Sequence, residues 1–128
     1  MANVEQLVGC RILVVEDDWF ISEALKRLLA GHGAILIGPV ATLSEALSLA
    51  EQDGFELAVI DIKLGDELAY PVADELRRQD VPFMFATGYS AEVLPERFSD
   101  VSFFEKPFDA AMVIKEAQRL CRVRQQQP

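Results

Sequence analysis

Residues 11–18 read RILVVEDD, an apolar run that ends in three consecutive acids. Residues 57–61 read LAVID, so that Asp61 directly follows a second run of apolar residues. Short apolar runs that lack polar alternation are expected of parallel strands covered on both faces. We therefore expect two buried strands, each with acidic side chains at its carboxyl end.

Runs of this kind alternate with helical patterns along the chain. The expected strands are Arg11–Val15, Ala34–Val40, Leu57–Ile60, Phe83–Ala86 and Val101–Phe104. Apolar residues recur at helical spacing in Phe20–Leu29, Leu43–Ala50, Val72–Arg78 and Ala110–Cys121. The candidate N-caps are Thr42 or Ser44 and Asp109. This alternation predicts a flavodoxin-like α/β fold, a doubly wound five-stranded parallel sheet of (βα)5 type with right-handed crossovers.

The fourth helix of this pattern has the weakest support. Its segment, Tyr89–Asp100, contains Pro95 and few apolar positions. We therefore expect a short or irregular helix there. Leu94 and Phe98 in this segment fit a patch that binds a partner and a place in the core equally well.

Length and composition limit the classes of function. The chain has 128 residues, 51% of them hydrophobic, which suits one packed domain. We expect an N-terminal extension over residues 1–8, the domain over 9–122 and a tail over 123–128. The net charge of −9 disfavours nucleic acid as a partner. No apolar run approaches the ~20 residues that span a bilayer, and no secretion signal is visible. We therefore expect a cytoplasmic protein that binds neither nucleic acid nor membranes.

The cysteines, Cys10 and Cys121, lie near opposite ends of the chain. A reducing compartment would keep them as thiols. We therefore expect two small buried hydrophobic residues rather than a disulfide. A zinc site would need more ligands than these cysteines and His32 supply. His32 lies between two glycines at an expected helix end, where we assign it no role.

Reactive side chains follow several of the expected strands. Glu16 and Asp17 follow the first strand, Asp61 the third, Thr87 the fourth, and Lys106 comes just after the fifth. Ligands bind doubly wound sheets beyond the carboxyl ends of the strands, so these side chains are expected to converge. Carboxylates in one crevice repel one another, and a divalent cation relieves that repulsion. Oxygen ligands of this kind suit Mg²⁺.

The same residues indicate a reaction. A carboxylate such as Asp61, held rigidly beside a metal ion, can attack a phosphoryl group and form an acyl phosphate. Lys106 would place a positive charge on one phosphoryl oxygen, and Thr87 would hydrogen-bond to another. Each residue alone also fits an ordinary surface or strand-end position, but the combination fits that interpretation poorly. Neither a P-loop nor a dinucleotide-binding glycine motif is present.

Residues 9–122 resemble the receiver domain of two-component response regulators. The features that carry the resemblance are ILVVEDD, LAVID, FATG with Thr87 and EKPF with Lys106. The resemblance implies that a histidine kinase or a histidine phosphotransfer protein phosphorylates Asp61. It also implies that Glu16 and Asp17 form the acidic metal pair.

Further roles follow from the same resemblance. The backbone carbonyl of Lys63 would coordinate Mg²⁺ together with the acids. Thr87 would be the switch hydroxyl, Lys106 the phosphate-binding lysine, and Phe103 the aromatic residue that rotates inward on activation. Phe103 stands where many receivers have tyrosine, so any switch would work through packing alone.

The stretch PFMFATGYS, preceded by DIKLGDELAYPVADEL, narrows the resemblance. It is similar to a subgroup of alphaproteobacterial single-domain regulators with a PFxFATG-type motif. In that subgroup the fourth helix is short or altered, and the proteins are linked to histidine kinases of the general stress response. No output domain follows residue 122 in this sequence, so we expect a stand-alone regulator that switches contacts with an unknown downstream protein.

Two other classes of protein share part of this pattern. An aspartyl-phosphate phosphatase uses a similar sheet and nucleophile, but it needs a second aspartate where this chain has Lys63. A degenerate receiver would bind partners without phosphorylation. This alternative is disfavoured because the chain has the expected residue type at all five key positions, Glu16, Asp17, Asp61, Thr87 and Lys106. We therefore expect a signalling phospho-acceptor that acts only on its own phosphoryl group.

Overall fold

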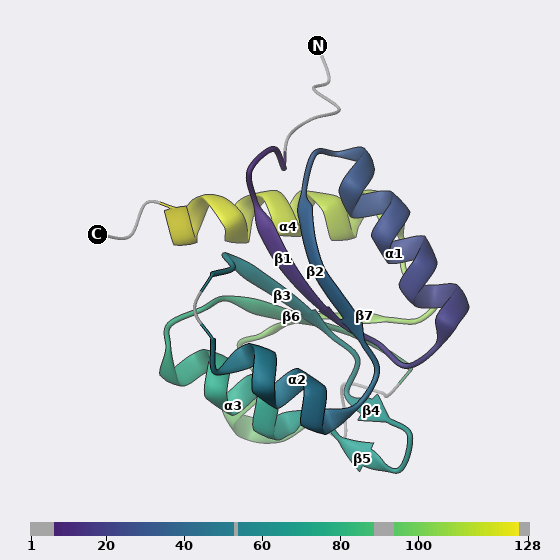
Figure 1. Cartoon of the computed structure of the whole chain (residues 1–128), viewed down its shortest axis with the longest axis vertical. Helices are drawn as coiled ribbons and strands as arrows, with labels where there is room; N and C mark the ends of the chain where they lie inside the picture. The colour runs from purple at the N-terminus through teal and green to yellow at the C-terminus, as the bar shows by residue number, and fades with distance from the viewer. Residues whose placement is uncertain (1–6, 53, 89–93, 126–128) are drawn as a thin grey trace.

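A five-stranded parallel sheet forms the centre of the protein, in the order β2-β1-β3-β6-β7 (Figure 1). The computed structural model describes residues 7–52, 54–88 and 94–125. The strands are β1 (Arg11–Val15), β2 (Ile35–Val40), β3 (Leu57–Ile60), β6 (Phe83–Thr87) and β7 (Ser102–Glu105). The order reverses between β1 and β3, as in other doubly wound folds, so the predicted fold class is confirmed.

Helices cover both faces of the sheet (Figure 1). The helices are α1 (Trp19–Gly31), α2 (Leu43–Ala50), α3 (Tyr70–Arg78) and α4 (Ala110–Gln125). On one face α1 and α4 enclose an apolar cluster, and on the other α2 and α3 enclose a second. In the described part of the chain, no helix is long and apolar enough to cross a membrane.

The side chains of β1 alternate between these two clusters. Leu13 and Val15 pack beneath α2 and α3, whereas Ile12 and Val14 pack beneath α1 and α4. Because successive side chains of a strand point to opposite faces, a strand covered on both faces needs apolar residues throughout. The continuous apolar runs in the sequence are therefore explained. Strand β2 lies at an edge of the sheet and is only partly buried.

Two of the predicted helix caps are present. The Thr42 side chain accepts a hydrogen bond from the Glu45 amide at 3.2 Å, at the start of α2. The Asp109 carboxylate accepts one from the Ala111 amide at 2.8 Å, just before α4. A side-chain oxygen at this position satisfies an amide that has no partner within the helix.

The segment between β6 and β7 is irregular where it is described. It contains a single 3₁₀ turn, Glu96–Phe98, while residues 89–93 lie outside the described part. Phe98 is 0% exposed and stacks on Tyr70 with 5.5 Å between ring centroids. Phe98 therefore has a place in the core and is not part of an exposed patch that could bind a partner.

A small antiparallel hairpin follows β3, and the sequence did not predict it. Its strands are β4 (Lys63–Leu64) and β5 (Glu67–Leu68). Leu64 is buried and anchors the hairpin in the core. Strands of two residues are too short to show an alternating pattern, so sequence periodicity could not reveal them.

The cysteines depart from the prediction. Cys10 and Cys121 form a disulfide with 6.3 Å between their Cα atoms, so the expectation of two free thiols is wrong. Both residues are buried, as predicted, in the cluster beneath α1 and α4. The cause is topological: Cys10 precedes the inner strand β1, and α4 packs over that face of the sheet. Distance along the sequence carries no information about this proximity.

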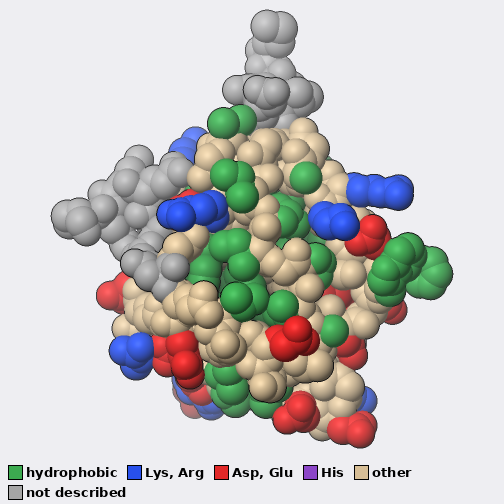
Figure 2. All heavy atoms as spheres, viewed as in Figure 1, with side chains coloured by type: hydrophobic (Ala, Val, Ile, Leu, Met, Phe, Trp, Pro, Cys, Tyr) green, Lys and Arg blue, Asp and Glu red, His purple; other side chains and the backbone are tan. Residues whose placement is uncertain are grey.

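Charged side chains are mixed on the visible surface. On the face shown in Figure 2, lysine and arginine side chains are scattered among acidic ones and form no continuous basic patch. A protein that binds nucleic acid through its phosphates gathers such residues on one face. The scattered basic side chains on this face agree with the excess of acidic residues, which gives the chain a net charge of −9.

Candidate functional site

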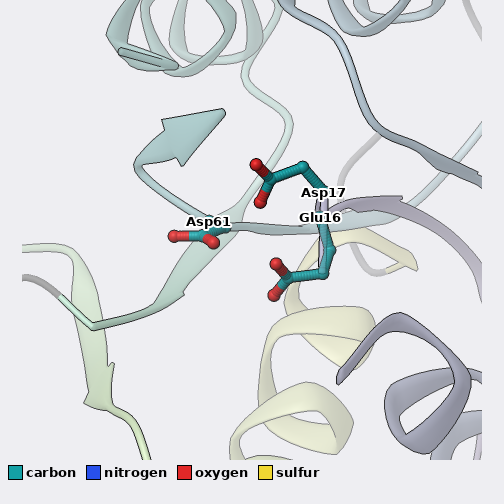
Figure 3. Close-up of side chains that lie close together, drawn as sticks. All are labelled: Glu16, Asp17 and Asp61. Atoms are coloured by element: carbon teal, nitrogen blue, oxygen red, sulfur yellow. The ribbon is translucent and has the colours of Figure 1, made fainter. Parts of the chain in front are cut away.

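The carboxyl ends of β1 and β3 bring three acids together. The two strands are neighbours in the sheet, with Val15 opposite Ile60. The residues that follow them, Glu16 with Asp17 and then Asp61, meet at this edge (Figure 3). One carboxylate oxygen from each lies within 4.8 Å of the others. Within the described ranges, no other group of acids, histidines or cysteines is arranged in this way.

The three acids differ in burial. Glu16 is 2% exposed and Asp61 is 7% exposed, whereas Asp17 is open to solvent. An ionised carboxylate loses much of its hydration when it is buried, and this costs free energy unless an opposite charge or a donor replaces the water. The site must therefore supply compensation for Glu16 and Asp61.

Lys106 supplies that compensation. Its Nζ lies 2.6 Å from Oε1 of Glu16 and 3.0 Å from Oδ2 of Asp61. The lysine is placed by the β6–β7 pair, because its amide donates to the carbonyl of Thr87 at 2.8 Å. A residue far along the chain therefore closes the site formed by the first and third strands.

The pKa values at the site follow from burial and these contacts. Burial raises the pKa of Glu16 to about 7, although the hydrogen bond from Lys106 opposes the change and Asp61 adds to it. Burial alone would lower the pKa of Lys106, but its hydrogen bonds to Glu16 and Asp61 outweigh that effect and raise it. Lys106 therefore stays cationic, and one ammonium faces three acids. The three acids outnumber the single ammonium, and their oxygens are the kind of ligand that a divalent cation such as Mg²⁺ prefers.

Backbone amides hold each of the three acids in place. Each of these hydrogen bonds runs from an N–H group to a carboxylate oxygen. The bonds are Asp18 to Glu16 at 3.1 Å, Lys63 to Asp61 at 3.3 Å, and Gly65 to Asp17 at 2.8 Å. The carboxylates are therefore oriented before any ligand arrives.

A cleft of about 320 Å³ opens over the acids. Its lining contains most of the residues that the sequence singled out and adds two glycines. The lining residues are Asp17, Asp18, Asp61, Lys63, Gly65, Thr87, Gly88 and Lys106. Thr87 is fully buried at the end of β6. The structure thus brings the predicted acids, hydroxyl and lysine to one place.

Phe103 is not among the residues that line this cleft. It is half-buried on β7 and meets Phe85 edge to face, with 6.5 Å between ring centroids. The lining residues Gly65 and Gly88 were not predicted from the sequence, and Gly65 is the one that contacts an acid, Asp17. The sequence signal for Gly65 was its pairing with Asp66 shortly after Asp61, which is typical of a hairpin turn.

Comparisons with known proteins show which family the chain resembles. A family model for the response regulator receiver domain matches residues 12–118. The phyllosphere-induced regulator PhyR of Methylorubrum extorquens is 34% identical over 110 residues, which cover 83% of this chain and 41% of PhyR. The transcriptional regulatory protein PdtaR of Mycobacterium tuberculosis is 28% identical over 88% of this chain and 57% of PdtaR. The chain thus spans about half the length of these curated relatives.

A solved structure gives the same result. The solution structure of SdrG from Sphingomonas melonis Fr1 superposes with a TM-score of 0.76 and 36% identity, over 88% of this chain and 96% of SdrG. Together with PhyR, it confirms the predicted resemblance to the alphaproteobacterial subgroup. Because the family model covers most of the chain, the chain belongs to the response regulator receiver domain family.

Proposed function

We propose that Asp61 of this chain accepts a phosphoryl group in a reaction that depends on Mg²⁺. Receiver domains are signalling phospho-acceptors rather than classical enzymes. The observation that carries the proposal is the contact of one Lys106 ammonium with both Glu16 and Asp61 at the carboxyl edge of the sheet. A nucleophilic carboxylate, a fixed positive charge and two further acids are the groups that this transfer needs.

The transfer from a phosphohistidine donor would proceed as follows. An Oδ atom of Asp61 attacks phosphorus, a new P–O bond forms, and the P–N bond to the donor imidazole breaks. The imidazole leaves and takes up a proton. Lys106 offers its ammonium to a phosphoryl oxygen, and the hydroxyl of Thr87 donates to another.

The acids would hold the metal ion. Glu16, Asp17, Asp61 and the backbone carbonyl of Lys63 would bind Mg²⁺, and the three carboxylates fit its preference for oxygen ligands. The ion, when bound, neutralises the oxygens of the transferring phosphoryl group.

The proposal extends to signalling. The donor would be a sensor histidine kinase or a histidine phosphotransfer protein, and the phosphorylated domain, residues 9–122, would change its contacts with a downstream protein. Thr87 and Phe103 would carry the change from the cleft to that surface, with Phe103 acting through packing. This activity would take place in the cytoplasm and would involve neither nucleic acid nor a membrane directly.

Phosphorylation by acetyl phosphate tests the central step. With Mg²⁺, intact-protein mass spectrometry should show the mass gain of one phosphoryl group on the wild type and none on Asp61→Asn. Asp109→Asn is a matched control, because asparagine also caps helices and Asp109 lies outside the cleft lining. No gain on the wild type, or a gain that survives in Asp61→Asn, would contradict the proposal.

A further inference from the structure

The turn of the β4–β5 hairpin reaches into the acidic cleft. The Gly65 amide donates a hydrogen bond of 2.8 Å to Oδ2 of Asp17, and both residues line the cleft. The two residues are 48 positions apart in the sequence. The contact therefore joins the loop after β3 to the acids after β1.

The geometry of the turn places this amide. Lys63 pairs with Leu68 and Leu64 with Glu67, so that Gly65 and Asp66 are the two turn residues. Gly65 has φ +61°, and glycine with positive φ at the first turn position is typical of a II′ hairpin turn. The buried side chain of Leu64 fixes the hairpin to the core, so the amide of the next residue has a defined direction.

Asp17 needs such a restraint more than its neighbours do. Glu16 and Asp61 are buried and paired with Lys106, whereas Asp17 is exposed. An exposed aspartate can sample several staggered rotamers, and a change of rotamer moves its carboxylate relative to the other acids. A hydrogen bond to one oxygen selects a rotamer and leaves the other oxygen for a cation.

We propose that Gly65 is a positioning residue for the metal site, because its amide fixes the carboxylate of Asp17 in the orientation that binds the cation. This inference rests on the proposed function, since it assigns a task within the same Mg²⁺-dependent site. The coupling is reciprocal: a cation that fixes Asp17 also stabilises the hairpin turn that holds it.

Substitution at Gly65 tests the inference. A Cβ there meets nothing within 4 Å, so the effect of alanine comes from its poor tolerance of positive φ. Gly65→Ala should raise the Mg²⁺ concentration that gives half-maximal phosphorylation by acetyl phosphate about fivefold, the effect of roughly 1 kcal/mol in orienting Asp17. The rate at saturating Mg²⁺ should stay near that of the wild type. Gly65→Asn should shift the midpoint less than Gly65→Ala does, because asparagine tolerates positive φ better than alanine.

Gly9→Ala is the matched control. Gly9 has φ +78° and equally open space around its Cβ position. It lies before the amino end of β1, whereas the cleft lies at the carboxyl ends of the strands. It should lose a similar amount of stability and keep the wild-type Mg²⁺ midpoint. An unchanged midpoint in Gly65→Ala, or a shift of the same size in Gly9→Ala, would overturn the inference.

A measurement on the wild type is independent of how the variants fold. In amide hydrogen exchange followed by NMR, the Gly65 amide should exchange more slowly once Mg²⁺ is added. If Mg²⁺ leaves its exchange unchanged while the protein is phosphorylated normally, the inference fails and the proposed function stands. If the wild type is not phosphorylated at all, the proposed function fails first.

Discussion

Nζ of Lys106 lies 2.6 Å from Oε1 of Glu16, a carboxylate that is almost completely buried. The pair connects the residue after β1 with the residue after β7, a strand at the opposite edge of the sheet from β2. A second contact takes the same ammonium to Asp61. Lys106 thus has two structural tasks: it compensates the buried charge of Glu16 and Asp61, and it holds the carboxylate of Asp61 in place.

Removing this ammonium should destabilise the protein in a way that Mg²⁺ relieves. Lys106→Met leaves two buried acids without their partner, and we expect a loss of about 3 kcal/mol in the free energy of unfolding measured with EDTA. A cation in the cleft replaces part of the lost charge, so the loss should be smaller in urea denaturation with Mg²⁺. Lys26→Met, which breaks an exposed pair with Glu23, should cost under about 0.5 kcal/mol. If Lys106→Met loses the same free energy of unfolding with Mg²⁺ as with EDTA, this role of Lys106 is contradicted.

Affinity for Mg²⁺ should depend on pH through Glu16. Without metal, burial raises the pKa of Glu16 to about 7, so below pH 7 its carboxyl holds a proton that a cation must displace. The affinity should therefore rise by up to about tenfold per pH unit below pH 7 and level off above it. Isothermal titration calorimetry between pH 6 and 8 measures this, and Glu16→Gln should flatten the profile. A profile already flat in the wild type would rule out this ionisation.

Trp19 should report metal binding. It begins α1 directly after the acids, is 66% exposed and meets Phe20 edge to face at 5.2 Å. A change of charge in the adjacent cleft should alter its fluorescence as Mg²⁺ is titrated to millimolar concentration. Asp17→Asn should weaken the response. A flat titration of the wild type would contradict a metal site that includes Asp17.

Reduction of the disulfide should lower stability. The bond between Cys10 and Cys121 joins positions 111 residues apart. In the chain-entropy account, a loop of that length lowers the entropy of the unfolded chain and so raises the free energy of unfolding by about 4–5 kcal/mol. Urea denaturation with and without reductant measures the difference. A variant with both cysteines replaced by alanine should show no response to reductant. Two alkylatable thiols in the unreduced protein would refute the bond.

Phe98 should be a determinant of stability. It is fully buried among Tyr70, Phe83 and Phe85, so Phe98→Ala should cost about 3–5 kcal/mol in thermal or urea unfolding. Phe20→Ala provides the contrast: Phe20 is largely exposed, and its loss should change stability by under about 0.5 kcal/mol. Similar costs for the two variants would mean that Phe98 is not packed as described.

The sequence predicted those parts of the site that depend on strand ends. An apolar strand shows itself in the sequence, and the residue that follows it must lie at the edge of the sheet. Glu16, Asp61 and Thr87 could therefore be placed together without coordinates. Their adjacency follows from the pairing of β1 with β3 and of β3 with β6.

Other features depend on distances that no local pattern encodes. Lys106 contacts both Glu16 and Asp61 because of the path that the loop after β7 takes, and no local sequence pattern reveals this path. The amide of Gly65 is a backbone group, and its direction comes from a turn too short to leave a periodic signal. The disulfide has no signal in the sequence for the same reason, since it depends on how α4 crosses the sheet.

The disulfide also determines how the domain would carry mechanical load. Cys10 lies just before β1 and Cys121 lies in the last helix, so the covalent loop encloses nearly every element of the fold. A force applied between the two chain ends would pass through the sulfur–sulfur bond and bypass the sheet. Under tension the oxidised domain would keep its acidic cleft intact, whereas the reduced domain would extend.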